Sequence, residues 1–390
     1  MTPILEDPPL HELDHERIDE LELRAERTDI RDGLSLLVSL LAAGAAITAI
    51  GLVIAFNGGD DEQVVTQAPA AADSAATGAA HDHSTHAASF SGDVEEYNRP
   101  DPTLPAPPAG DVKKFRLDVY EHVTKVSADQ PATRVWSYAV SGKFNRGTGV
   151  SEPMVVTEGD KVEITLVNGA SEKMDVRMPH SVDYHSSEVA PNEAFKTIQP
   201  GETHRFSFVA NHPGVFMYHC ATDPVLMHTG AGMVGMMVVK PKNLAPVDRE
   251  LWMTQQEFYI GEEGQDADPA KMAAKAPDVL TFNGYAAQYK DHPITVKRGE
   301  TIRMYVLNAG PSIWSAFHLI GTVFDTTHVE GVVGHDAQTI NLAPSQGGWV
   351  EFTLDQEGSY PFVTHAFGDM VKGAVGVLAT ENAPATEMKH

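Results

Sequence analysis

The stretch VTEGDKVEITLVN, residues 156–168, recurs further along the chain as VKRGETIRMYVLN, residues 296–308. The matched positions of the two copies include Gly159 with Gly299 and Asn168 with Asn308. Each copy places a glycine turn before alternating apolar and polar residues, a pattern that is typical of a half-buried strand. An internal repeat of this kind indicates two copies of one β domain.

A second pair of segments extends the repeat. HPGVFMYHCA (212–221) matches QEGSYPFVTHA (356–366), so that His219 corresponds to His365 and Cys220 to Ala366. Short runs rich in Val, Ile, Phe, Tyr and Thr, separated by turn residues, fill the chain from about residue 111. This pattern predicts an all-β chain of two tandem Greek-key sandwiches or barrels, at 111–243 and 244–383.

The chain's one cysteine lies in YHCATDPVLMHTGAGM, residues 218–233. Cys220, His228 and Met233 follow one another on this loop, and His180 in MPHSVDYH supplies a second imidazole. A buried cysteine or methionine alone is usually a packing residue. Two histidines, a cysteine and a methionine together are the ligand set of a copper electron-transfer site. We therefore predict copper here, and Ala366 excludes an equivalent site in the second repeat.

The remaining histidines predict a second metal site. In an extended strand, residues an odd number of positions apart face opposite ways. His180 and Cys220 can therefore share one face, while His185 and His219 share the other. His365 is the natural third ligand, and a neighbouring subunit of a homo-oligomer is expected to supply it. An all-imidazole site with an open position suits copper or zinc chemistry on a small ligand.

Three further residues are expected beside the second site. Asp183 lies between His180 and His185 in HSVDYH, and His318 lies in the second-repeat counterpart of that region. A carboxylate and an imidazole there can pass protons to a metal-bound oxyanion. Ile320 would form an apolar wall beside the open position. The ordinary alternatives are a turn acid for Asp183 and a core histidine for His318.

Composition limits the class of protein. The chain has 390 residues and a formal net charge of −26, which argues against a nucleic-acid partner because phosphate binding needs a basic surface. One cysteine excludes an internal disulfide framework. Two folded units and additional segments fit the length.

The N-terminal third carries a candidate membrane anchor. Residues 35–56, SLLVSLLAAGAAITAIGLVIAF, contain no charge and at ~1.5 Å per residue span roughly 33 Å as a helix. The apolar core of a cleaved signal peptide is shorter, so an uncleaved single-pass helix is favoured. Four arginines precede the segment and predict a cytoplasmic N-terminus with the β domains outside: Arg17, Arg24, Arg27 and Arg31. The acidic tail at 1–34 forms either a short amphipathic helix or a disordered segment.

Residues 57–110 are rich in Ala, Gly, Ser, Asp and Pro, which predicts a disordered tether that is extended and semi-rigid near its end. The segment HDHSTH contains His81, His83 and His86. Short histidine tracts can bind metal, and the alternative of incidental histidines in a solvated linker is slightly favoured.

The segments PHSVDYH, YHCATDPVLMHTGAGM, FHLIGTVFD and THAFGDMVKGAVG resemble the copper-containing nitrite reductases, which are two-domain cupredoxins. The resemblance covers about residues 111–380 and is closest to the neisserial outer-membrane type. It departs at Ser181, where the family usually has Asn, and in AFGDMV after His365, where Phe and Arg residues are common.

This resemblance implies a homotrimer that reduces nitrite to nitric oxide with two copper ions per chain. Its type 1 copper ligands correspond to His180, Cys220, His228 and Met233. Its type 2 copper ligands correspond to His185, His219 and, from the adjacent subunit, His365. Its proton-delivering pair corresponds to Asp183 and His318, and its substrate-pocket isoleucine to Ile320.

Two other functions remain open from the sequence. A two-copper enzyme could act on oxygen or on another small nitrogen species, because the segment after His365 differs. A membrane-anchored electron carrier would use the first copper alone. A laccase is disfavoured, because His81-Asp82-His83 in the tether is the chain's sole His-x-His pair. The electron donor, expected to be a small redox protein, is not defined by the sequence.

Overall fold

The structure is a computed structural model that describes residues 93–169 and 176–384. The predicted tail at 1–34, the membrane helix at 35–56 and the histidine tract with His81, His83 and His86 lie outside the described residues. Within the described ranges, no helix has the length and apolar character needed to cross a membrane.

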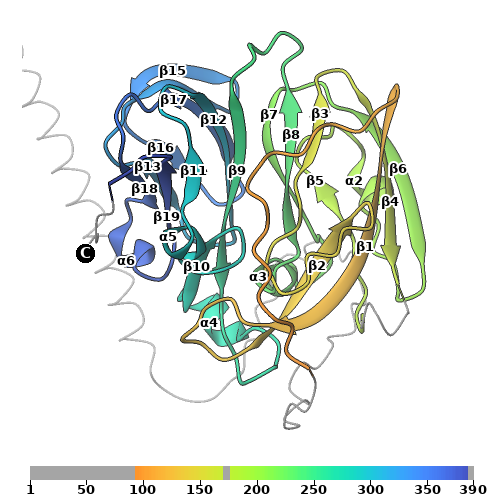
Figure 1. Ribbon diagram of the computed structural model, residues 1–390. Helices are drawn as coiled ribbons and strands as arrows, with labels where there is room; N and C mark the ends of the chain where they lie inside the picture. Colours follow the sequence, from red (N-terminus) through yellow and green to blue (C-terminus); the bar gives the residue numbers. More distant parts are fainter. Residues whose placement is uncertain (1–92, 170–175, 385–390) are drawn as a thin grey trace, which may run out of the picture. The chain divides into compact units, whose positions relative to one another are not determined.

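The first sandwich consists of two four-stranded sheets (Figure 1). One sheet has the spatial order β2 (Thr133–Val140), β1 (Val112–Thr124), β4 (Lys161–Asn168) and β6 (Thr203–Val209). The other has the order β3 (Met154–Thr157), β8 (Val234–Lys240), β7 (Gly214–His219) and β5 (Asp183–Tyr184). Side chains from both sheets, including Leu117, Ile164 and Tyr218, form one buried cluster.

The second sandwich has a sheet of six strands and a sheet of five. The first has the order β10 (Val279–Phe282), β9 (Arg249–Phe258), β12 (Thr301–Gly310), β17 (Gly347–Thr353), β14 (Phe324–Val329) and β15 (Val332–Ala337). The second has the order β11 (Ile294–Val296), β19 (Val375–Thr380), β18 (Ser359–Thr364), β13 (Ser315–Leu319) and β16 (Ile340–Leu342). The prediction of a mostly β chain is confirmed, and β1–β8 lie within 111–243 and β9–β19 within 244–383.

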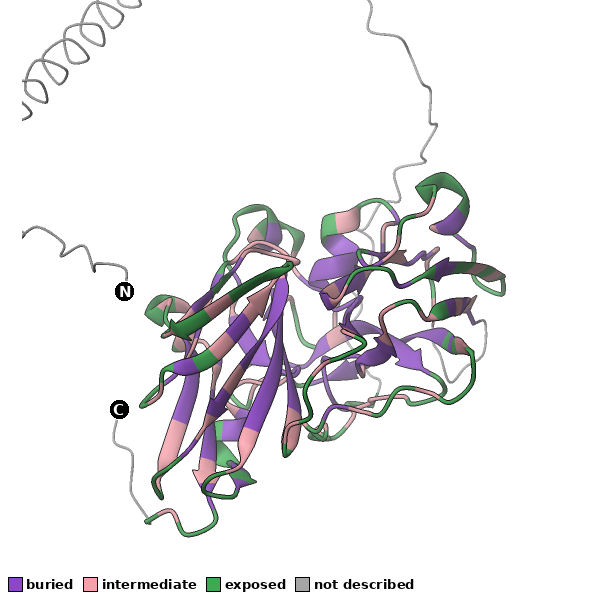
Figure 2. Ribbon diagram, turned by 90° about the horizontal axis from the view of Figure 1, so that it is seen from above, coloured by how far each residue is buried: buried purple, intermediate pink, exposed green. Residues whose placement is uncertain are grey.

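Short helices connect the strands: α2 (Pro191–Ala194), α3 (Val225–Gly230), α4 (Pro269–Ala273), α5 (Gln288–Asp291) and α6 (Phe367–Met370). Buried residues line the strands of both sandwiches, and exposed residues concentrate in the connections (Figure 2). The helix α3 matters most for function, because it carries part of the loop between Cys220 and Met233.

The repeated motif has the same structural role in both sandwiches. Gly159 and Gly299 have φ values of +83° and +81°, a conformation that side chains disfavour, and each turns the chain into the following strand. The buried Asn168 side-chain amide donates to the carbonyls of Met178 and Ile198, at 2.9 and 3.0 Å. Its counterpart Asn308 donates to two carbonyls in the same way. Each asparagine therefore fixes the segment after its strand, which in the first sandwich leads to His180.

The sandwiches pack against each other through the sheet of β3, β8 and β7 and the sheet of β9, β12 and β17. Met236, Trp252 and Trp349 belong to one buried cluster at this contact. The strand β12 is therefore buried on both faces. Its polar residues are buried like its apolar ones, so the alternation in its sequence does not produce an alternation of buried and exposed residues.

The last part of the predicted tether packs against this body. The backbone N–H of Leu104 donates to Glu250 O at 3.0 Å, and that of Trp252 donates to Pro102 O at 2.9 Å. The Leu104 side chain is buried in the cluster between the sandwiches. The composition of 57–110 did not predict this contact, because one leucine and a few backbone hydrogen bonds dock the extended segment at 100–104.

Candidate metal centres

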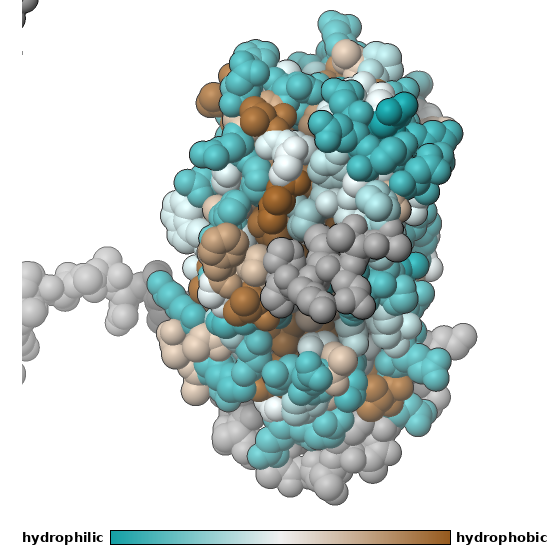
Figure 3. Space-filling model, turned by 60° about the vertical axis from the view of Figure 1, so that its left-hand side comes forward, coloured by the Kyte–Doolittle hydropathy of each residue, from teal (hydrophilic) through white to brown (hydrophobic). Residues whose placement is uncertain are grey.

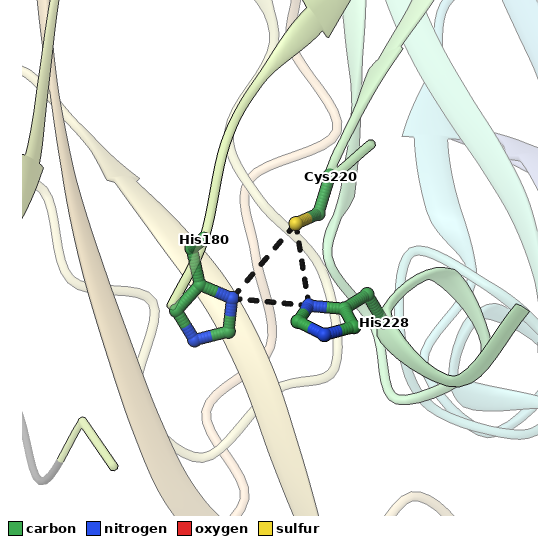
Figure 4. A group of neighbouring side chains, drawn as sticks. All are labelled: His180, Cys220 and His228. Atoms are coloured by element: carbon green, nitrogen blue, oxygen red, sulfur yellow. Dashed lines mark hydrogen bonds between the residues drawn. The ribbon is translucent and has the colours of Figure 1, made fainter. Parts of the chain in front are cut away.

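Three completely buried side chains meet at one end of the first sandwich. His180 follows the segment fixed by Asn168, Cys220 follows β7, and His228 lies on α3. Figure 4 shows the two rings and the sulfur pointing toward one another. The Nδ1 atoms are 3.1 Å apart, and the Cys220 Sγ lies 3.2 Å from His228 Nδ1 and 3.8 Å from His180 Nδ1. We call these three residues the first cluster.

The first cluster fits a metal ion. A point equidistant from its three ligand atoms lies about 2 Å from each, close to the bond lengths that divalent metals form with imidazole nitrogen and thiolate sulfur. Met233, the predicted fourth ligand, is fully buried, and its backbone is tied to both neighbours. Its carbonyl accepts from Cys220 N, and its N–H donates to His228 O, each at 3.1 Å.

Burial controls the charge of the first cluster. It places the pKa of His180 well below its ordinary value, with repulsion from His228 as the lesser cause. It also raises the pKa of the Cys220 thiol, against the effect of hydrogen bonds from the backbone of Ser181 and Thr222. His180 is therefore neutral and ready to bind a metal, and a bound metal would displace the proton of the Cys220 thiol. Trp136 covers both rings edge-on, at centroid distances of 5.6 and 5.0 Å.

Asp183, His185 and His219 form a second cluster, more exposed than the first. The antiparallel pairing of β5 with β7 sets Asp183 opposite His219. The Nε2 atoms of His185 and His219 are 3.1 Å apart, and Asp183 Oδ2 lies 3.9 Å from His219 Nε2. Burial and then repulsion from His219 lower the pKa of His185, while Asp183 raises it. Two imidazoles beside a carboxylate are suited to binding a metal and moving a proton.

The adjacent residues His219 and Cys220 belong to different clusters. Cys220 is fully buried, whereas the His219 side chain is 14% exposed. The His219 ring is fixed by its Nδ1, which lies 2.8 Å from the Cys220 carbonyl. This contact leaves Nε2 facing His185. One peptide unit therefore joins the two clusters covalently.

His365 and His318 lie together on the second sandwich. Their ring centroids are 5.0 Å apart, since the backbone N–H of His365 donates to Ala316 O on the neighbouring strand. His318 Nδ1 donates to the carbonyl of Gln338. Ile320 is 39% exposed just after β13. Among the described residues, the candidate metal-binding groups of this chain do not include His365.

Sequence reasoning missed several contacts of these sites. Trp136 lies on β2, far from the histidine motifs in sequence, and no spacing rule points to it. Phe367 packs edge-on against His365 at a centroid distance of 4.9 Å. Its position two residues after His365 is the feature of the sequence that could have predicted this contact.

Known proteins resemble this chain in sequence and in fold. A family model described as multicopper oxidase matches residues 130–244. A copper-containing nitrite reductase of Neisseria gonorrhoeae is 36% identical over 288 residues, which cover 70% of each chain. One from Neisseria meningitidis serogroup B is 39% identical over 244 residues, covering 60% of this chain and 62% of the relative.

Solved structures agree with these relatives. The copper nitrite reductase of Nitrosomonas europaea superposes with a TM-score of 0.62 at 29% identity, over 70% of this chain and 94% of that one. A copper-containing nitrite reductase from Thermus scotoductus gives 0.60 at 32% identity, over 70% and 63%. A multicopper oxidase at 22% identity shares the fold, with a TM-score of 0.58. With the cysteine-histidine cluster and the neighbouring histidine cluster in place, the chain belongs to the copper-containing nitrite reductase family.

Proposed function

We propose that this protein reduces nitrite to nitric oxide, with one copper ion at each cluster. Copper in the first cluster would take up one electron at a time, and copper in the second would bind nitrite and deliver that electron. The reaction consumes one electron and two protons per nitrite and releases nitric oxide and water.

The adjacency of His219 and Cys220 is the observation that carries this proposal. The buried ligand set of Cys220 excludes water and suits electron storage, whereas the exposed set of His219 leaves room for a small anion. Because the two side chains belong to consecutive residues, an electron has a short covalent route from one set to the other. An electron carrier with one metal would have no use for the second cluster.

Asp183 and His318 are the proposed proton donors. The Asp183 carboxylate lies 3.9 Å from His219 Nε2 and is 30% exposed, so it can take up protons from water and hold one beside the bound anion. The Nδ1 of His318 is fixed by Gln338, which leaves its Nε2 free to face a substrate. Ile320 is the proposed apolar wall of the same pocket.

We propose a homotrimer in which His365 from one subunit completes the second cluster of the next. Support comes from the position of His365, which lies beside His318 rather than in the cluster of its own chain. Most of the exposed large apolar side chains in the described residues lie on the second sandwich: Trp314, Ile320, Val323, Val332, Val333, Phe367 and Val371. Figure 3 shows apolar patches on this side of the molecule. A partner subunit would cover such a surface.

The sequence further supports a single-pass membrane protein. The uncharged segment 35–56 would anchor the chain, with residues 1–34 in the cytoplasm and the two sandwiches outside. The tether after the anchor would give the sandwiches reach toward a small redox protein as electron donor.

Copper content and nitric oxide production test the function directly. The full-length protein in detergent, supplied with a reduced artificial donor without oxygen, is expected to hold about two copper ions per chain and to form nitric oxide from nitrite. His185→Ala should keep the visible colour of the first copper and lose nitric oxide production. A protein with both copper ions that produces no nitric oxide would refute nitrite reduction. An oxygen-consumption assay on the same sample would then test the oxygen alternative.

A further inference from the structure

Ser181 separates the first cluster from a pair of threonine hydroxyls. It directly follows His180 and is completely buried. Its backbone N–H donates to the Cys220 Sγ at 3.4 Å, and its hydroxyl oxygen lies 3.9 Å from the same sulfur. The Tyr138 hydroxyl donates to the Ser181 carbonyl at 2.6 Å, which fixes the backbone of this residue.

The hydrogen bonds of Ser181 determine the direction of its O–H. A hydroxyl has one donor and two acceptor positions. The Ser181 oxygen accepts from the backbone N–H of Ala221 at 3.0 Å and from the Thr222 hydroxyl at 3.1 Å. Both acceptor positions are then occupied, and the remaining O–H has the Cys220 sulfur as its acceptor.

The chain of hydroxyls continues toward the surface. The Thr222 Oγ1 lies 3.0 Å from the Thr197 Oγ1. Since Thr222 donates its own proton to Ser181, Thr197 must donate to Thr222. All three hydroxyls then point the same way, from exposed Thr197 to the buried sulfur. Aligned hydrogen bonds of this kind polarise and strengthen one another.

We propose that Thr197, Thr222 and Ser181 form a hydroxyl chain that donates to the Cys220 sulfur and raises the reduction potential of the first copper. A hydrogen bond to the sulfur withdraws electron density from the thiolate, which weakens its donation to the oxidised ion and favours the reduced one. Ser181 acts through the sulfur of Cys220 and is a positioning residue in this role. The inference rests on copper at the first cluster and is independent of the substrate at the second.

The test is a redox titration of the full-length, copper-loaded protein, followed by the visible absorption of the first copper. Ser181→Ala is expected to shift the ratio of reduced to oxidised copper about tenfold toward the oxidised form at a given potential, a fall of ~59 mV. Thr222→Val should shift it about threefold, and Thr197→Val less than twofold, because each lies one step further from the sulfur. Ser181→Thr keeps the hydroxyl and should restore the wild-type potential.

Thr229→Val is the matched control. Thr229 follows His228, but its hydroxyl donates within its own helix, to Val225 O at 2.9 Å. The Thr229→Val variant should be less stable than the wild type, and the reduction potential of its first copper should be unchanged. The proposal is overturned if Ser181→Ala retains copper at an unchanged potential, or if Thr229→Val shifts the potential equally. If Ser181→Ala does not fold, an unchanged potential in Thr222→Val overturns it.

Copper content and nitrite turnover are measured in the same samples. A wild-type protein with a coloured first copper and no nitric oxide production would refute the proposed reaction, while the graded shifts would still support the hydroxyl chain. A wild-type protein without copper at the first cluster would refute both.

Discussion

The first and second clusters lie on either side of one peptide unit and differ in almost every physical respect. The first is completely buried and has its ligands within one sandwich. The second is partly exposed, and within its own chain it has two histidines and a carboxylate. A closed site changes little when its metal gains an electron, whereas an open site can exchange ligands. Burial therefore separates electron storage from substrate chemistry in sites only one residue apart.

The two repeats show which residues of one fold accompany this difference. Both sandwiches keep the glycine turn and the buried asparagine, because these residues fix the loops. The strands β7 and β18 both end beside a histidine, His219 and His365, but Ala366 stands where the first repeat has Cys220. The second repeat therefore retains a histidine at its surface and has no thiolate for a closed site.

The largest expected effect is that of Cys220→Ala. Without the thiolate, the first cluster should lose its copper and its visible colour, and the copper content should fall from about two ions per chain to about one. Nitrite turnover with a protein donor should fall by orders of magnitude, since the electron has no entry site. Metal analysis and the absorption spectrum provide the measurement. Met236→Leu, which replaces another buried sulfur, should retain both. Loss of both copper ions in Cys220→Ala would contradict the independence of the clusters.

The second prediction concerns the second cluster and the proposed role of His365 in it. His185→Ala and His365→Ala should each be inactive alone. If His365 acts across a subunit contact, assembling equal amounts of the two variants together should restore about a quarter of the sites. With random mixing, about half of the contacts have an intact His185 on one side, and about half of those have an intact His365 on the other. Nitric oxide production of the mixed assembly is the measurement. Recovery near zero, in assemblies shown to contain both variants, would mean that His365 does not complete a neighbour's site.

The third prediction tests the Asp183 carboxylate of the second cluster. Asp183→Asn should keep both copper ions but slow turnover about 10- to 100-fold, because the amide cannot cycle a proton. The acid limb of the pH–rate profile should change as well. Glu188→Gln, an exposed acid on the same loop, serves as the control and should leave both unchanged. An Asp183→Asn enzyme with the wild-type rate at every pH would exclude a proton role for Asp183.

Particular residues show what the sequence could predict. The repeats predicted the strands, since Val162, Ile164 and Leu166 alternate inward on β4 as their pattern requires. The odd spacing of His180 and His185 predicted two groups of side chains on opposite faces, and the structure groups them in this way. Trp136, Thr197 and Phe367 escaped prediction, because their contacts depend on how loops and sheets pack rather than on a periodic pattern. The packing of Leu104 between the sandwiches was not predicted for the same reason.

The smallest expected effect is on stability and concerns His122, a buried histidine outside both clusters. His122 is buried, with 4% of its surface exposed, and among the described residues it belongs to neither cluster; its Nε2 donates to the Thr148 carbonyl at 3.2 Å. Burial, helped by the charge of Arg146, lowers its pKa to about 4. An unfolded histidine has a pKa near 6.5, so below that pH the unfolded chain binds a proton that the folded protein refuses.

Stability should therefore fall as the pH decreases from 7.5 to 5, and this one group should account for about 2 kcal/mol of the loss. His122→Gln should be less sensitive to acid by that amount in denaturant unfolding of the copper-loaded protein. His212→Gln, which replaces an exposed histidine paired with Glu188, should keep the wild-type sensitivity. An equal loss in wild type and His122→Gln would show that burial alone does not keep a histidine neutral in this sandwich. The neutral state of His180 in the first cluster would then have to come from metal binding.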